Sequence, residues 1–136
     1  MIYGTWCYRI MTAVRIFKSR WFQRFARKER IADAALRNAV ARAERGQIDA
    51  DLGGDVIKQR IARPGEGKST LYRTIILFRR GSRAFFEYGF SKSQRANISE
   101  DEEAQFKEAA RRILTLTDKH LAELLRRGDF VEVNCE

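Results

Sequence analysis

Basic side chains that could bind and cut a polyanion are concentrated between residues 57 and 98. This segment holds ten lysines and arginines and two acidic residues, a net charge of +8 out of +9 for the whole chain of 136 residues. Lys58 and Arg60 are two residues apart in strand-like sequence, which places them on one face of a sheet. Charge concentrated in this way predicts a surface for nucleic acid or an acidic partner.

These residue types are suited to RNA cleavage. Attack by a ribose 2′-hydroxyl needs a base, an acid for the leaving 5′-oxygen, and cations near the phosphorus. Lys58 and Lys68 are candidate bases. Glu66 and Glu87 are the only carboxylates in the basic segment, and Glu87 is more typical of an ion-pair partner. The single histidine, His120, lies outside the segment, which excludes a histidine pair and any histidine-based zinc site.

The segment at residues 62–69, ARPGEGKS, matches the pattern of a nucleotide-binding loop. Such a loop must lead into a helix whose N-terminal amides hold phosphate. Here it leads into LYRTIILF, which has strand character, so we reject a nucleotide site and expect no cofactor. We interpret the segment as a basic hairpin, and we expect Arg63, Lys68 and Arg83 to bind nucleic acid.

The elements that position these residues follow from periodicity and capping residues. Apolar alternation and helical spacing predict an α+β fold with a small, mostly antiparallel sheet, an N-terminal helical hairpin and C-terminal helices. Residues 1–10 are expected to be a disordered extension, and residues 11–136 a single domain. The expected strands are 14–18, 56–62, 71–79, 83–90 and 130–133, with helices beginning after Ser19, Asp33, Ser99 and Thr117 and a loop at 49–55.

The composition favours a cytoplasmic protein. No apolar run approaches the ~20 residues of a membrane-spanning helix. The first ten residues lack the features of a secretory signal, and either Met1 or Met11 can be the start. Cys7 and Cys135 lie near opposite ends of the chain and offer neither a disulfide framework nor a metal-binding spacing, so both are expected to be thiols.

The order of these segments resembles the RelE/ParE superfamily of toxins from type II toxin–antitoxin systems, and within it the RelE-like, HigB-like subfamily. The resemblance rests on VRIFKSRWFQRFARKE, DADLGGDVIKQRIARPGEGKS, YRTIILFRRG and RAFFEYGFSKSQRANIS, and it spans roughly residues 14–116. It implies a bacterial protein with a cognate antitoxin that wraps and neutralises it. It also implies cleavage of mRNA on the ribosome, without metal, and inhibition of translation.

The resemblance implies a catalytic set on the strands and in the loop that follows them. The family's basic positions match Lys58, Arg60, Arg73, Lys92 and Arg95. Two departures stand out. Asn97, Ile98 and Ser99 occupy the place of the family's tyrosine, and Ser93 occupies one position of the basic cluster.

Three hypotheses therefore remain open. The basic set favours a ribosome-dependent mRNA endoribonuclease. The missing tyrosine favours either a ParE-like toxin that inhibits DNA gyrase or a non-catalytic basic domain neutralised by an acidic partner. In each of the toxin hypotheses, no membrane and no small molecule is expected as a partner.

Overall fold

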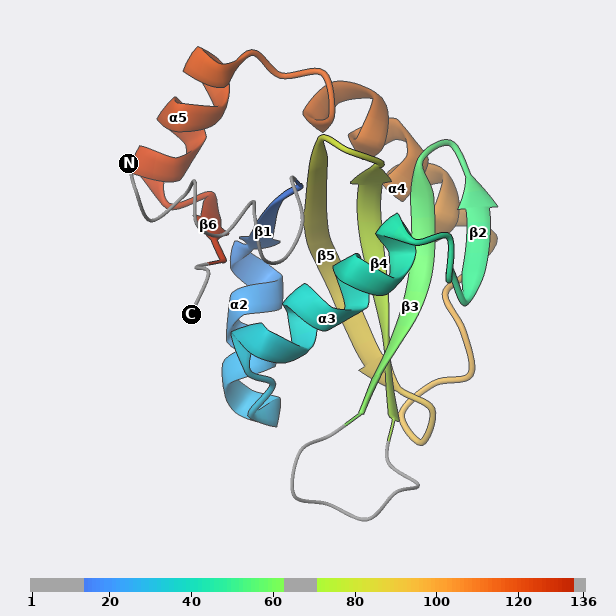
Figure 1. Cartoon of the computed structure of the whole chain (residues 1–136). Coiled ribbons are helices and arrows are strands. Elements are labelled where there is room, and N and C mark those ends of the chain that lie inside the picture. The colour runs from blue at the N-terminus through green and yellow to red at the C-terminus, as the bar shows by residue number, and fades with distance from the viewer. Residues whose placement is uncertain (1–13, 63–70, 134–136) are drawn as a thin grey trace.

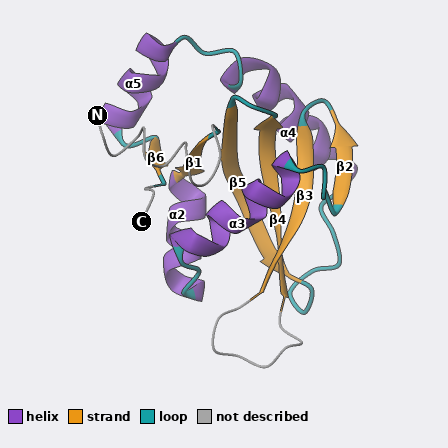
Figure 2. Ribbon diagram, in the orientation of Figure 1, coloured by secondary structure: helices purple, strands orange, loops and turns teal. Residues whose placement is uncertain are grey.

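The computed structural model describes residues 14–62 and 71–133, which form one six-stranded sheet with helices on both faces (Figures 1 and 2). In chain order the elements are β1 (Arg15–Ser19), α2 (Arg20–Glu29), α3 (Asp33–Glu44), β2 (Ala50–Gly53), β3 (Val56–Ala62), β4 (Leu71–Arg79), β5 (Arg83–Ser91), α4 (Glu100–Ile113), α5 (Asp118–Arg127) and β6 (Phe130–Glu132).

The strand order is β2-β3-β4-β5-β1-β6. Strands β2 to β5 form an antiparallel meander, whereas β1 lies parallel to β5 and β6 closes the edge antiparallel to β1. The pairing of β1 with β5 runs from Arg83 to Phe86 and ends there. Helix α2 begins directly after β1 and continues along the second half of β5.

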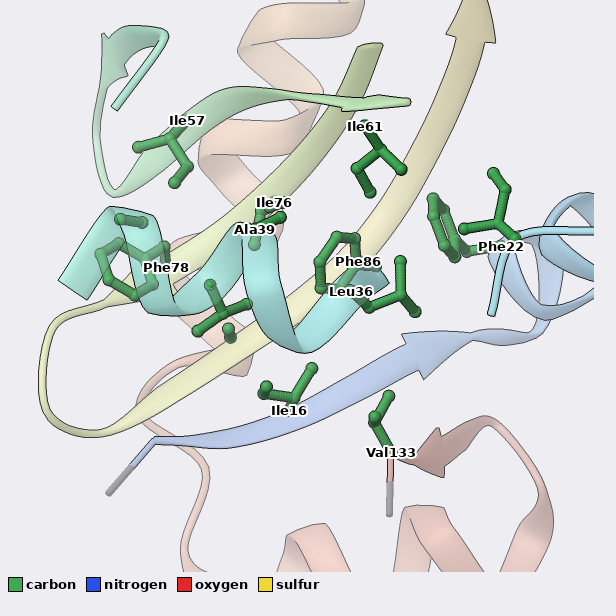
Figure 3. Close-up of a cluster of buried hydrophobic side chains, with 14 of the residues drawn as sticks. Ile16, Phe22, Leu36, Ala39, Ile57, Ile61, Ile76, Phe78, Phe86 and Val133 are labelled. Atoms are coloured by element: carbon green, nitrogen blue, oxygen red, sulfur yellow. The ribbon is translucent and has the colours of Figure 1, made fainter. Parts of the chain in front are cut away.

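Helices α2 and α3 cover one face of the sheet. Their buried residues, among them Phe22 and Leu36, meet Ile16, Ile76 and Phe86 from the strands in one apolar cluster (Figure 3). The expected N-terminal helical hairpin is not confirmed, because the chain enters the sheet first as β1. Each helix then packs on strands of its own, α2 against β1 and β5, and α3 against β3.

Helices α4 and α5 pack on the opposite face, where a second cluster joins Phe17, Ile75 and Phe85 to Ala110 and Leu121. Capping residues fix where these helices begin. Ser99 and Glu102 form the predicted capping box, and the Thr117 side chain caps α5. For α3 the expected cap is wrong, since Asp33 is the first helical residue and the cap position is Ala32, without a side-chain bond.

The segment predicted as a loop at 49–55 contains strand β2, which pairs with β3 through a tight turn. Gly53, Gly54 and Asp55 adopt positive φ angles of 84°, 62° and 64° in that turn. The aspartates and glycines thus mark a hairpin turn rather than a longer irregular loop.

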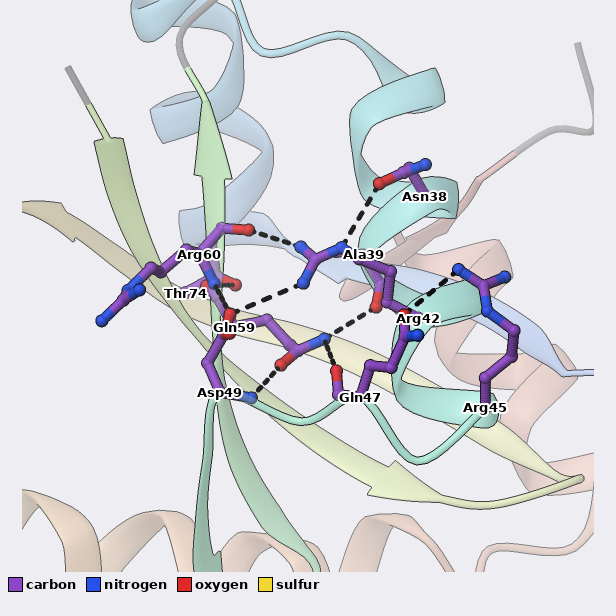
Figure 4. A network of polar contacts seen from close by, with 9 residues as sticks. All are labelled: Asn38, Ala39, Arg42, Arg45, Gln47, Asp49, Gln59, Arg60 and Thr74. Atoms are coloured by element: carbon purple, nitrogen blue, oxygen red, sulfur yellow. Dashed lines mark hydrogen bonds and ion pairs between the residues drawn. The ribbon is translucent and has the colours of Figure 1, made fainter. Parts of the chain in front are cut away.

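A buried glutamine joins β3 to helix α3 and to the chain before β2 (Figure 4). Gln59 Nε2 donates to the carbonyl oxygens of Ala39 at 2.9 Å and Gln47 at 3.3 Å, while its Oε1 accepts from the Asp49 amide at 2.7 Å. Arg42 completes the network by donating to the Arg60 carbonyl oxygen at 2.7 Å. Both ends of a fully buried amide are therefore satisfied, which holds β3 in one register.

Strand β5 contains an irregularity opposite the step from Ile75 to Ile76, where Glu87 is inserted between the paired residues Phe86 and Tyr88. This extra residue shifts the alternation of the strand. Phe86 faces α2 and α3, yet Tyr88 packs on the other side with the second apolar cluster. The Glu87 carboxyl is largely buried, its Oε2 has no hydrogen-bond partner among the described residues, and burial raises its pKa to about 7.

We predict that Gln59→Leu lowers the free energy of unfolding by about 2–3 kcal/mol, because the Asp49 amide and the Ala39 carbonyl lose their partner inside the protein. Urea denaturation measures this. Gln47→Leu is the matched control, since the Gln47 side chain is exposed, and it should change stability by less than about 0.5 kcal/mol. Equal effects of the two changes would show that the network does not hold β3.

We also predict that stability falls as the pH rises through 7. Because the native pKa of Glu87 lies above its ordinary value of 4.5, the native state binds the proton more tightly than the unfolded chain. The stabilisation is complete below about pH 4.5 and is lost as the pH passes 7, a change of about 3 kcal/mol. Urea titrations from pH 5 to 8.5 should show this slope, and Glu87→Gln should remove it. An unchanged slope in that variant would contradict the assignment.

Candidate functional site

The basic residues of β3 and β4 share the face of the sheet on which α4 packs. Val56, the first residue of β3, belongs to the cluster on that face, and Lys58 and Arg60 follow it with the same parity. The registers place these residues in two rows across three strands. One row is Lys58, Ile75 and Tyr88, and the other is Arg60, Arg73 and Phe90.

Arg95, from the turn after β5, closes this site over the two aromatic rings. Its guanidinium carbon lies 5.8 Å from the ring centres of both Tyr88 and Phe90. Arg95 Nη1 donates to the Tyr88 hydroxyl at 3.1 Å, and Nε donates to the Asn97 carbonyl oxygen at 2.9 Å. A tyrosine hydroxyl therefore lies beside a fixed guanidinium on the basic face.

Asn97 brings Lys58 to the same place. Lys58 Nζ donates to Asn97 Oδ1 at 3.0 Å, so one residue contacts both the lysine of β3 and the arginine of the turn. The sequence resemblance marks residues 97–99 as the place where a tyrosine is missing. In the fold, Tyr88 supplies a hydroxyl to this region from a different element.

Glu102 holds Arg95 from the other side. Its two carboxylate oxygens accept from Arg95 at 2.7 and 3.0 Å, and its Oε1 also accepts from the Ser99 amide at 2.7 Å in the capping box. Hydrogen bonds from Arg95, followed by those from Ser99, lower the pKa of Glu102 to about 2. The hydrogen bonds to Glu102, and then to Tyr88, raise the pKa of Arg95, which is therefore a permanent cation.

Arg60 and Arg73 lie directly opposite each other on neighbouring strands. Like charges in this position destabilise a sheet. Among the residues that the structure describes, no carboxylate pairs with either guanidinium. The arrangement is electrostatically incomplete in the protein alone and is suited to a phosphate placed between them.

The other predicted basic residues that the structure describes, Lys92 and Arg83, are not gathered with this group. Lys92 lies exposed in the turn after β5, near Arg95 in sequence, and forms no hydrogen bond or ion pair with another described residue. Arg83 lies at the opposite end of β5, where it donates to the Leu116 carbonyl oxygen at 2.6 Å and to Asp118 at 2.8 Å. Its guanidinium secures the connection between α4 and α5. Arg63, Lys68 and Glu66 fall outside the described residues, as do Cys7 and Cys135.

Sequence reasoning missed the part that α2 plays beside this site. The helix contributes Trp21, Arg24 and Lys28 to a hollow next to Tyr88 and Arg95. The sequence signal that could have revealed this role is the local charge of the helix. Residues 20–30, RWFQRFARKER, contain five basic side chains and one acidic one, although the chain outside residues 57–98 is nearly neutral in sum.

The described ranges contain neither a metal-binding cluster nor a membrane-spanning helix. No group of three histidine, cysteine, aspartate or glutamate side chains is placed to hold a metal ion. No helix in these ranges combines the length and the apolar character needed to cross a bilayer. His120 is exposed on α5, where its amide donates to the Thr117 cap.

Comparison with known proteins identifies the family. The sequence model of one protein family, described as the RelE toxin of the RelE/RelB toxin–antitoxin system, matches residues 14–133. No curated protein and no solved structure shows significant similarity to the chain. The family match extends from the first described strand through the last one, and it includes both rows of the basic face. The chain therefore belongs to the RelE family of toxins from toxin–antitoxin systems.

Proposed function

We propose that this toxin is a metal-independent endoribonuclease that cuts mRNA on the ribosome and thereby inhibits translation. The observation that carries the proposal is the clustering of Lys58, Arg60, Arg73 and Arg95 with the Tyr88 hydroxyl on one face of the sheet. Toxins of the RelE family pair with an antitoxin. We therefore assign two partners to this chain, mRNA on the ribosome and a cognate antitoxin. We place mRNA cleavage and antitoxin binding in the cytoplasm, where ribosomes and mRNA are found.

The proposed reaction is transfer within the RNA chain. The 2′-oxygen attacks the adjacent phosphorus, a P–O bond forms, and the bond from phosphorus to the 5′-oxygen breaks. The products are a 2′,3′-cyclic phosphate and a 5′-hydroxyl end. One proton leaves the 2′-hydroxyl and one reaches the 5′-oxygen, so no water, metal or further reactant is consumed.

The site residues divide these tasks by their chemistry. Arg60 and Arg73 bind the non-bridging phosphate oxygens, whose negative charge grows in the transition state. Tyr88 takes the proton of the 2′-hydroxyl in its phenolate form and becomes a neutral phenol, and Arg95, which donates to this oxygen, stabilises the negative charge of the phenolate. Lys58 enters the site as a hydrogen-bond donor through its contact with Asn97, and it supplies the proton to the 5′-oxygen. Lys92, exposed beyond β5, contributes to RNA binding.

The proposal is tested by mapping mRNA ends on ribosomes after induction of the toxin in cells that lack an antitoxin. Primer extension on translated messages should show new 5′ ends within reading frames. Growth arrest with intact mRNA and impaired gyrase would instead support a ParE-like activity. Soluble protein without any effect on growth would support a non-catalytic binding domain.

Arg73→Ala should lower the rate of mRNA cleavage by about a hundredfold, equivalent to about 3 kcal/mol of transition-state stabilisation. Arg79→Ala is the matched control, because Arg79 belongs to the same strand but lies at its other end, paired with Asp55 at 3.2 Å. That change should leave the rate nearly unaltered. Equal losses in two folded variants would show that net charge, and not a site, is responsible.

Tyr88→Phe should lower the cleavage rate by about a hundredfold while RNA affinity changes little, because only the proton-transferring hydroxyl is removed. Tyr72→Phe provides the comparison. Its hydroxyl donates to Glu29 at 2.5 Å on the other face of the sheet, so its loss should reduce stability but not catalysis. Single-turnover cleavage by purified toxin and programmed ribosomes separates the two effects. A fully active Tyr88→Phe variant would exclude the assigned role.

A further inference from the structure

A pocket of about 430 Å³ lies beside the candidate site, between α2 and the half of β5 that β1 leaves unpaired. Trp21, Arg24, Lys28 and Glu29 line it from the helix, and Tyr88 and Arg95 from the other side. Two of the residues that line it, Tyr88 and Arg95, thus belong to the proposed active site. The pocket has no role in the reaction described above.

Helical spacing explains why α2 presents these residues together. Positions 21, 24, 25 and 28 share one face of a helix, and that face is turned towards β5. Gly89 allows the close approach, since a Cβ atom on it would lie 2.5 Å from the Phe25 ring. Helix α2 therefore packs closely against the unpaired edge of β5, with the Phe25 ring at the contact.

Trp21 is the feature that most needs an explanation. It is 40% exposed and is the one large apolar side chain that is exposed among the described residues. Its ring stacks on the Phe25 ring, with ring centres 5.3 Å apart and an angle of 15° between the planes. The centre of the Tyr88 ring lies 4.6 Å from that of Trp21. The indole is held rigidly by two other rings while part of its surface remains open to solvent.

The surroundings of Trp21 are cationic. Arg24 and Lys28 are exposed, and neither forms an ion pair with a described residue, whereas Arg20 on the same helix pairs with Asp129 at 3.0 Å. Glu29 is the only acidic residue among the described residues that line the pocket, and it accepts a hydrogen bond from the Tyr72 hydroxyl. A rigid aromatic surface between unpaired cations matches the chemistry of single-stranded nucleic acid, whose bases stack on rings and whose phosphates bind lysine and arginine.

We propose that this pocket is a subsite for a nucleotide next to the one that is cut. Its base stacks on Trp21, and its phosphate contacts Arg24 and Lys28. The subsite rests on the proposed function for its position relative to the cut, because Arg95 lines both places. It contributes affinity and a preference for bases at one flanking position, while the two rows of the sheet perform the chemistry.

Tryptophan fluorescence tests the stacking directly. Trp6 and Trp21 are the only tryptophans in the chain, so a toxin carrying Trp6→Phe reports on Trp21 alone. The 2′-hydroxyl is the attacking group in the proposed reaction, so an RNA without free 2′-hydroxyls is not cut during the titration. The probe is a short single-stranded RNA with 2′-O-methyl groups. Saturable quenching of Trp21 supports the subsite, and RNA binding without quenching overturns it.

Affinity measurements on variants give a second and independent test. Trp21→Ala should weaken binding of the same RNA by about tenfold, within the range for loss of one stacked base, and Trp21→Phe should retain most of the affinity. Arg24→Ala and Lys28→Ala should each reduce the salt dependence of binding by about one counterion. Arg126→Ala, an exposed arginine on α5, should leave it unchanged.

The outcomes distinguish the subsite from the proposed function. Quenching and a Trp21 effect on binding, without mRNA cleavage by the unaltered toxin, support the subsite and contradict the nuclease. Cleavage that depends on Arg73 but has the same rate and base preference in Trp21→Ala overturns the subsite alone. Unchanged RNA affinity with weakened antitoxin binding in Trp21→Ala assigns the pocket to the antitoxin and also overturns it.

Discussion

The position of the candidate site depends on one buried amide. Gln59 ties β3 to α3 and to the chain leading into β2, and Thr74 on the neighbouring strand donates to the Gln59 carbonyl oxygen at 2.9 Å. Side chains alternate along a strand, so a slip of one residue in β3 would turn Lys58 and Arg60 from the basic face into the core under α3. A polar side chain in this place costs desolvation unless all its hydrogen bonds are made, and this requirement admits only one register.

The basic face also shows how stability and function are divided in this fold. The arginine pair of β3 and β4 places like charges opposite each other, whereas cations elsewhere, such as Arg83 and Arg20, are matched with carboxylates and carbonyls. The two apolar clusters on either side of the sheet supply the burial that holds these repelling charges in place. Under the proposed function an anionic ligand would balance these charges, and the same property suits the face to an acidic partner.

Much of this arrangement could be predicted from the sequence, and the exceptions have physical causes. Strands β3 and β4 were predicted with the observed bounds, because their apolar and β-branched residues are bounded by clear turn residues. Strand β2 was missed because its few residues lie among aspartates and glycines that are also typical of loops. The face of the sheet on which Tyr88 lies could not be predicted. The irregularity at Glu87 changes the alternation of side chains along β5, and the local composition gives no sign of it. The exposure of Trp21 could not be predicted, because helical periodicity does not reveal where a neighbouring strand loses its partner.

The carboxylate of Glu102 serves two structures at once, and this has a thermodynamic consequence. It closes the capping box at the start of α4 and also holds Arg95. A phosphate that draws Arg95 away leaves the carboxylate to the helix alone, while fraying of the first turn of α4 removes the anchor of the arginine. Occupancy of the site and order of the helix end are therefore linked equilibria, and linkage acts equally in both directions. A partner that binds the start of α4 can change the affinity of the site for phosphate without contacting any residue of the site.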